Sequence, residues 1–171
     1  MATGVCIIIA FLLQDVNNFL LVMIYYNMLS VKIIAVGNLE SYFAEAVAEY
    51  VKRLGRYCNL SIIQIKHSDQ KHEVAEIKKH LTKGAVCLCD IGGTIVSSVD
   101  MAKKLEQVSM SPGAITFIIG GSDGVGNLLD DVNHEKISFG RITLPHQLFR
   151  VILVEQIYRA FTILNNEKYH K

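Results

Sequence analysis

The chain has 171 residues, of which 51% are hydrophobic, and its formal net charge is +1. This length suits one domain with a sizeable core, and the near-zero charge gives no overall electrostatic case for binding nucleic acid. The cysteines, at positions 6, 58, 87 and 89, lack the spacing of redox or zinc motifs. We expect reduced thiols in a cytoplasmic protein.

The first 30 residues differ from the rest of the chain. They hold two apolar runs, Val5–Leu13 and Phe19–Tyr26, and Asp15 is their only charged residue. Each run is too short for a transmembrane helix, and the segment lacks the basic start of a secretory signal. We therefore expect residues 1–30 to be a leader outside the main domain, with a translation start at Met28. A membrane-surface anchor is the alternative interpretation.

From residue 31 onward, apolar runs alternate with segments of helical periodicity. Strands are expected at Val31–Gly37, Leu60–Ile65, Ala85–Asp90, Ala114–Ile119 and residues 137–143. Helices are expected at Phe43–Leu54, His72–Leu81, Val99–Val108 and Leu148–Leu164. This alternation predicts an α/β fold, with a mainly parallel sheet covered by helices on both faces, in a single domain of residues 31–171.

The last expected helix carries two arginines on opposite faces. Pro145 suits its first turn, where the missing N–H has no intrahelical partner anyway. Arg150 and Arg159 lie nine residues apart, about 180° around the helix. One arginine is therefore expected to face water and the other to lie in apolar surroundings, where it needs a partner or a ligand. Glu155 and Arg159 should form an ion pair, and Tyr158 should pack at an interface.

A glycine-rich segment, Gly120–Gly126, directly follows the fourth expected strand. Open parallel sheets bind ligands beyond the carboxyl ends of their strands. The segment is not a Walker-type phosphate loop, because Asn127 and Leu128 stand where Lys and Ser or Thr are required. The pattern alone leaves two interpretations open, a nucleotide-binding loop or a plain tight turn.

The histidines outside the last helix give no metal motif. His72, Glu76 and His80 share one helical face, but Glu76 stands where a zinc motif needs its second histidine. The neighbouring lysines and glutamates favour a solvated face, so no metal site is expected. His134, beside Glu135, is interpreted as loop surface.

Four segments carry a resemblance to a known family. They are Ile118–Gly124, Leu144–Val151, Glu155–Ala160 and Tyr169–Lys171, within a likeness that covers essentially everything from Val31. Together they resemble the bacterial rRNA pseudouridine N3-methyltransferases, the RlmH type of the SPOUT class. The resemblance implies a homodimer with a C-terminal trefoil knot that binds S-adenosylmethionine. It also implies methylation of N3 of a pseudouridine in large-subunit (23S) rRNA, within the assembled ribosome.

The resemblance also implies which residues form the site. The cofactor pocket would comprise Cys89, Gly120, Phe139, Gly140, Arg141, Ile142, Thr143 and Leu144. The catalytic and substrate-side residues would be Arg150, His146, Tyr169, His170 and Lys171. Backbone groups of the run 139–144 would hold the adenine.

Each catalytic candidate has a structural alternative. Arg150 either stabilises the imide anion or binds phosphate, or else it pairs with a carboxylate of the core or interface. His146 either accepts a proton or forms a structural hydrogen bond. The tail Tyr169–Lys171 is either a frayed end or a clamp that reaches the other protomer's pocket. In both cases its removal is expected to cost within ~1 kcal/mol of stability.

Two departures from the family pattern accompany this interpretation. The segment Lys66–Lys71 is shorter than in the family, which counts against the family's contacts with RNA at this place. Cys89 stands where the family commonly has leucine, which is a mild change because cysteine is a small hydrophobe. No stable membrane association is expected. Two other functions stay open: a noncatalytic nucleotide- or RNA-binding module, and a methyltransferase of the same class that acts on a different RNA.

Overall fold

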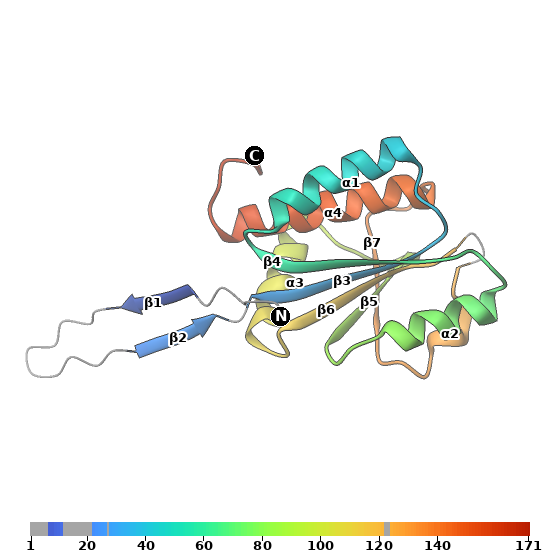
Figure 1. Ribbon diagram of the computed structural model, residues 1–171, viewed down its shortest axis with the longest axis horizontal. Helices are drawn as coiled ribbons and strands as arrows, with labels where there is room; N and C mark the ends of the chain where they lie inside the picture. Colours follow the sequence, from blue (N-terminus) through green and yellow to red (C-terminus); the bar gives the residue numbers. More distant parts are fainter. Residues whose placement is uncertain (1–6, 12–21, 27, 122–123) are drawn as a thin grey trace, which may run out of the picture.

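The computed structural model describes residues 7–11, 22–26, 28–121 and 124–171. Its body is a five-stranded sheet covered by helices (Figure 1). The strands of this sheet are β3 (Leu29–Val36), β4 (Cys58–Ile65), β5 (Ala85–Ile95), β6 (Ala114–Ile119) and β7 (Glu135–Ser138). The helices are α1 (Ser41–Leu54), α2 (Gln70–His80), α3 (Ser98–Met110) and α4 (His146–Leu164), with a 3-10 turn, η1, at Gly126–Leu129.

The strand order is β4-β3-β6-β5-β7, and every neighbouring pair is parallel. Parallel neighbours need crossover connections, which here carry the helices. The predicted α/β class with a parallel sheet is therefore confirmed. Because all five strands point the same way, the segments that leave β3, β5 and β6 start from the same edge of the sheet.

Helices cover both faces of the sheet, as predicted. On one face Val31, Ile33 and Ala35 of β3 belong to a core shared with α1, α3 and α4. On the other face Ile34 and Val36 belong to a second core shared with α2 and η1. A strand buried on both faces reads as a continuous apolar run, which is why the sequence predicted β3 and β6 so well.

Helix α4 lies on the first of these faces, side by side with α1 (Figure 1). Pro145 is its N-cap residue, in agreement with the sequence. The Tyr158 ring packs against the Tyr50 ring of α1, with centroids 5.9 Å apart. The Ser98 hydroxyl of α3 donates to Gln156 Oε1 at 2.7 Å. Helix α4 is thus held between α1 and α3.

The expected strand at residues 137–143 is wrong in extent. Strand β7 ends at Ser138, and residues 139–145 form a loop that leads to α4. The Ser138 hydroxyl donates to the carbonyl oxygen of Gly140 at 2.6 Å, and Gly140 has a φ of 142°. These features turn the chain away from the sheet. The apolar residues among 139–143 are therefore not explained by burial in a strand.

Strand β5 is longer than expected, because it continues through Gly92 and Gly93 to Ile95 instead of ending at Asp90. Its pairing with β7 shifts register between Cys89 and Thr94. A Cβ on Gly93 would lie 2.6 Å from the Lys136 carbonyl carbon, so the glycine permits the close approach of the two strands.

Before the sheet, β1 (Ile7–Phe11) and β2 (Val22–Tyr26) pair as antiparallel strands. The remaining residues of the predicted leader, up to residue 27, lie outside the described part of the chain. The first strand of the parallel sheet begins at Leu29, two residues before its expected start. In the described ranges no helix is long and apolar enough to cross a membrane. The domain boundary at residue 31 stays a prediction.

Candidate functional site

The exit of β3 meets the start of α4 at one edge of the sheet. Arg150 Nη2 donates to the carbonyl oxygens of Val36 and Gly37, at 2.5 and 2.6 Å. His146 Nε2 lies 3.0 Å from the position that a Cβ would take on Gly37. Gln147 accepts a hydrogen bond from the Glu40 backbone N–H at 2.7 Å. The first two turns of α4 are therefore fixed to the segment that links β3 with α1.

Arg150 is the buried arginine of the predicted pair, with 3% of its surface exposed. Burial lowers the pKa of its guanidinium from the ordinary value. One of the two interpretations gave Arg150 a carboxylate partner, but its observed acceptors are two backbone carbonyl oxygens. Its Nε has no hydrogen-bond partner among the described residues. In this arrangement Arg150 anchors α4 to β3 and contributes a positive charge at the edge.

The same positive charge acts on His146. Burial lowers the pKa of His146, and the charges of Arg150 and His67 lower it further. A lower pKa increases the fraction of neutral imidazole near pH 7, and only the neutral form can accept a proton. Of the two alternatives for His146, its surroundings are compatible with proton acceptance.

Two of the expected cofactor residues belong to adjacent strands, with Cys89 in the middle of β5 and Gly120 just past the end of β6. Cys89 of β5 is paired with Ile119 of β6, and Gly120 follows directly. Burial raises the pKa of the Cys89 thiol, so it stays protonated and presents a small apolar surface. A Cβ on Gly120 would lie 3.3 Å from backbone atoms of Gly124 and from Val125 Cγ1. The glycines thus form a tight turn, a geometry that also permits close approach of a ligand.

The loop of residues 139–145 carries the rest of the expected cofactor run. Arg141 Nη1 donates to the Gly93 carbonyl oxygen at 2.9 Å and also to that of Ile91. Both acceptors belong to the long strand β5. The Arg141 side chain therefore attaches the loop to β5, the strand that also carries Cys89.

The middle of this loop has free backbone groups. Phe139 stacks on Phe149 of α4, with ring centroids 5.3 Å apart, which fixes the start of the loop. The peptide groups of Arg141, Ile142 and Thr143 form no hydrogen bond with any described residue. All three residues are exposed. Their N–H and C=O groups are therefore available to a ligand such as a nucleoside base.

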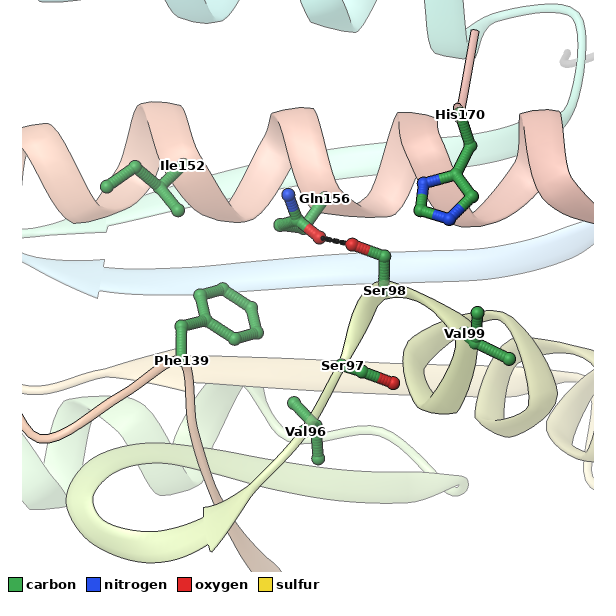
Figure 2. A pocket seen from close by; sticks show the side chains of 8 residues that line it. All are labelled: Val96, Ser97, Ser98, Val99, Phe139, Ile152, Gln156 and His170. Carbon is green, nitrogen blue, oxygen red and sulfur yellow. Dashed lines mark hydrogen bonds between the residues drawn. The ribbon is translucent and has the colours of Figure 1, made fainter. Parts of the chain in front are cut away.

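A pocket of about 550 Å³ lies between α4, the start of α3 and the C-terminal tail (Figure 2). Of the predicted site residues it is lined by Phe139 and His170 alone. Ser97, Ser98 and Gln156 also line it, and sequence reasoning missed them. A signal existed for Ser97, which forms the capping box that starts α3 together with Asp100. Its remaining lining residues are Val96, Val99 and Ile152.

The tail is not a frayed end at Tyr169. The Tyr169 ring meets the Tyr158 ring edge-on at 4.9 Å, and the Arg159 guanidinium lies 4.7 Å from its centroid. Its hydroxyl donates to Glu155 Oε1 at 3.0 Å and contacts the Tyr50 hydroxyl at 3.4 Å. Burial raises the Tyr169 pKa, and the hydrogen bonds with Tyr50 and Glu155 raise it further, so the phenol stays protonated.

The residues around Tyr169 complete this attachment. The predicted ion pair of Glu155 with Arg159 is present at 2.6 Å. Glu167 accepts from Arg56 at 2.6 Å and from the Tyr57 hydroxyl at 2.7 Å. These contacts hold the tail on the chain's own helices α1 and α4 as far as Tyr169. His170 and Lys171 follow as exposed residues.

The polar face of α2 is solvated, as expected. The side chain of His72 is 79% exposed and pairs with Asp69, and Glu76 pairs with Lys79 at 2.5 Å. Across the described parts of the chain, no group of three or more His, Cys, Asp or Glu side chains could hold a metal ion.

Comparison with known proteins identifies the family. A family model described as "Predicted SPOUT methyltransferase" matches residues 29–170. The chain belongs to the SPOUT methyltransferase family. The match starts where β3 starts and includes the loop before α4, α4 itself and His170. The prediction of a methyltransferase of this class is thus confirmed.

Curated relatives align with a large share of the chain. A protein of Caldicellulosiruptor saccharolyticus named "Ribosomal RNA large subunit methyltransferase H" is 41% identical over 153 residues, which is 82% of this chain and 99% of that protein. Proteins with the same name from Mesoplasma florum and Lactobacillus helveticus are 38% and 40% identical. Each of these two alignments covers 84% of this chain and the whole of the relative.

Proposed function

We propose that this protein transfers a methyl group from S-adenosylmethionine to N3 of a pseudouridine in large-subunit rRNA, in the assembled ribosome in the cytoplasm. The observation that carries the proposal is the near full-length similarity to relatives named as large-subunit rRNA methyltransferases. The choice of N3, of pseudouridine and of the assembled ribosome follows from the resemblance of the motifs around the glycine turn, α4 and the tail.

The residues at the sheet edge fit an adenosyl cofactor. Cys89 and Gly120 would line its pocket, and the free peptide groups of residues 141–143 would bind its adenine. When bound, S-adenosylmethionine supplies an electrophilic methyl group. The chain's own contribution is then to position the cofactor, because in-line methyl transfer depends first on alignment. The C-terminal trefoil knot of the class is part of this proposal.

The target base has to lose its imide proton before or during transfer. His146 is a candidate acceptor, because burial and neighbouring positive charge favour its neutral form. The fixed charge of Arg150 would stabilise an anion at this edge, although its Nη2 is already bound to backbone carbonyls. At the other end of α4, His170 lines the large pocket and would act on the substrate with Lys171. Tyr169 would hold this end of the tail in place.

The site is proposed to be complete only in a homodimer. Helix α4 is covered by the sheet, α1 and α3, yet Phe149, Ile152 and Ile163 keep part of their apolar surface exposed. A second copy of the same surface would cover these side chains in a two-fold symmetric contact. In such a contact the tail of one protomer would lie beside the cofactor of its partner. Sedimentation at micromolar concentration should give the mass of a dimer, and an active monomer would contradict this part of the proposal.

The decisive experiment uses ribosomes from cells that lack the gene. The full chain and radiolabelled S-adenosylmethionine should place one methyl group per ribosome, and mass spectrometry of the digested rRNA should locate it on N3 of a pseudouridine. Calorimetry should give binding of about one cofactor per chain, with a matching rise in thermal stability. Cofactor binding without turnover on any RNA would favour a noncatalytic binding module. Turnover on free tRNA would favour a different RNA substrate.

A further inference from the structure

Glu73 is the only buried acidic side chain among the described residues, with 3% of its surface exposed. It lies in the first turn of α2, on the face of the sheet opposite α4. An acidic residue in a first turn interacts favourably with the helix dipole, but exposed positions provide that benefit without desolvation. A buried carboxylate needs partners, and the partners of Glu73 lead to the glycine turn.

The Glu73 carboxylate lies between the loop that precedes α2 and the glycine segment. Oε1 accepts the Ser68 backbone N–H at 2.9 Å and pairs with His67 Nδ1 at 2.7 Å. On the other side, Oε2 lies 2.7 Å from the position that a Cβ would take on Gly121, and Oε1 lies 3.3 Å from it. The carboxylate therefore fills the space that any side chain at position 121 would need.

The same turn of α2 contacts the glycine segment at a second place, Gly124. Gln70 Nε2 donates to the Gly124 carbonyl oxygen at 3.3 Å. The Gly124 N–H in turn donates to the Gly121 carbonyl oxygen at 3.0 Å. Helix α2 thus supports the segment at Gly121 and at Gly124, directly after Gly120 and the end of β6.

We infer that Glu73 is a positioning residue for the cofactor. Its carboxylate sets the path of the backbone at Gly121, and this path fixes Gly120 at the cofactor pocket. The inference rests on the proposed function, in which Gly120 borders S-adenosylmethionine. The competing role is purely local, with Glu73 fixing the entry to α2 through Ser68 and His67. A local role would change folding stability, but it would not couple Glu73 to Gly121 in cofactor affinity.

A double-mutant cycle on the full chain separates these roles. Calorimetry with S-adenosylmethionine and S-adenosylhomocysteine would compare wild type, Glu73→Ala, Gly121→Ala and the double variant, each shown to be folded by circular dichroism. Each single substitution should weaken binding about tenfold, a scale typical of residues in contact. The double variant should bind no more weakly than Gly121→Ala alone, because truncation at position 73 makes room for the added methyl group. Glu76→Ala is the matched control, since Glu76 lies on the same helix with its side chain 45% exposed.

A second substitution covers the case in which Glu73→Ala does not fold. Glu73→Asp keeps the charge but withdraws the oxygens by about one bond length, so it should restore binding to Gly121→Ala. Three results would each overturn the inference. The first is wild-type affinity in folded Glu73→Ala, and the second is independent losses that multiply to about a hundredfold in the double variant. The third is a failure of Glu73→Asp to restore binding to Gly121→Ala. A wild-type chain that binds neither ligand would instead refute the proposed function on which the inference rests.

Discussion

Replacing Tyr169 by alanine should destabilise the chain by about 2–3 kcal/mol, which is more than a C-terminal residue normally contributes. The edge-on contact with Tyr158 accounts for about 0.5–1.5 kcal/mol, and the Arg159 guanidinium near the ring for about 0.5–1 kcal/mol. The hydrogen bond to Glu155 adds about 1 kcal/mol, which is below the ~1.5–3 kcal/mol of a bond to a charged group because the pair is partly exposed. The sequence-based expectation of a cost within ~1 kcal/mol for the whole tail is therefore too low.

Thermal unfolding is a direct assay of this cost. For a chain of this length, each kcal/mol corresponds to a shift in Tm of about 2–4 °C, so Tyr169→Ala should lower Tm by roughly 5–10 °C. Tyr169→Phe keeps the ring contacts and should lose only the hydroxyl part, about 1 kcal/mol. His170→Ala is the matched control, because His170 is exposed, and its effect should stay within about 0.5 kcal/mol. A Tm for Tyr169→Ala within 1 °C of wild type, on the ~2–4 °C scale above, would refute the reasoning.

His170 should matter for methyl transfer although it contributes little to stability. His170→Ala should leave cofactor affinity nearly unchanged and reduce transfer to ribosomes by about a hundredfold, the scale for losing a positioned acid–base group. Parent-level transfer by a folded His170→Ala variant would remove this residue from the chemistry.

Three further predictions concern the sheet edge. Gly120→Val should abolish binding of S-adenosylmethionine. Even a Cβ at this position would lie 3.3 Å from atoms of the turn, so the larger branched side chain would collide with it. Unchanged calorimetric affinity would remove Gly120 from the site. Arg150→Met should lower the free energy of urea unfolding by about 3 kcal/mol, because the carbonyl oxygens of Val36 and Gly37 lose their charged donor; a loss below about 1 kcal/mol would contradict this role. Because the pKa of His146 is lowered in the folded chain, the unfolded chain binds the proton first as pH falls below 6.5. Stability should therefore decline below that pH, and His146→Gln should flatten this part of the pH profile.

Local apolar patterning was enough to predict the central strands of the sheet. Strand β6 was predicted with its observed bounds, and β3 to within two residues at its start, because strands buried on both faces are apolar throughout. The same criterion failed for the segment after Ser138. Among the described strands, β7 pairs with β5 alone, and the hydrogen bonds between Ser138 and Gly140 end it early. Its extent depends on those tertiary contacts, which periodicity does not encode.

The side chains that organise the candidate site were harder to predict, because their partners are distant in sequence. Helical geometry predicted that one arginine of α4 is buried, but the acceptors of Arg150 lie more than 110 residues away. Tyr169 was assigned to the substrate, and its contact with Tyr50 spans 119 residues. Glu73 gave no signal at all, since a glutamate in the first turn of a polar helix is normally exposed. In each case the three-dimensional partner, rather than the residue type, determines the role.

Helix α4 connects these separate parts of the site. Arg150 at its start is bound to the exit of β3, Gln156 lines the large pocket, and Tyr158 packs against Tyr169 of the tail. At about 1.5 Å per residue, Arg150 and Gln156 are separated by roughly 9 Å along the helix axis. Because one continuous helix carries all three contacts, the cofactor edge and the pocket beside His170 keep a fixed separation. In the proposed dimer, where each tail meets the partner's cofactor, the alignment of both sites would then depend on how firmly α4 is held between α1 and α3 in each protomer.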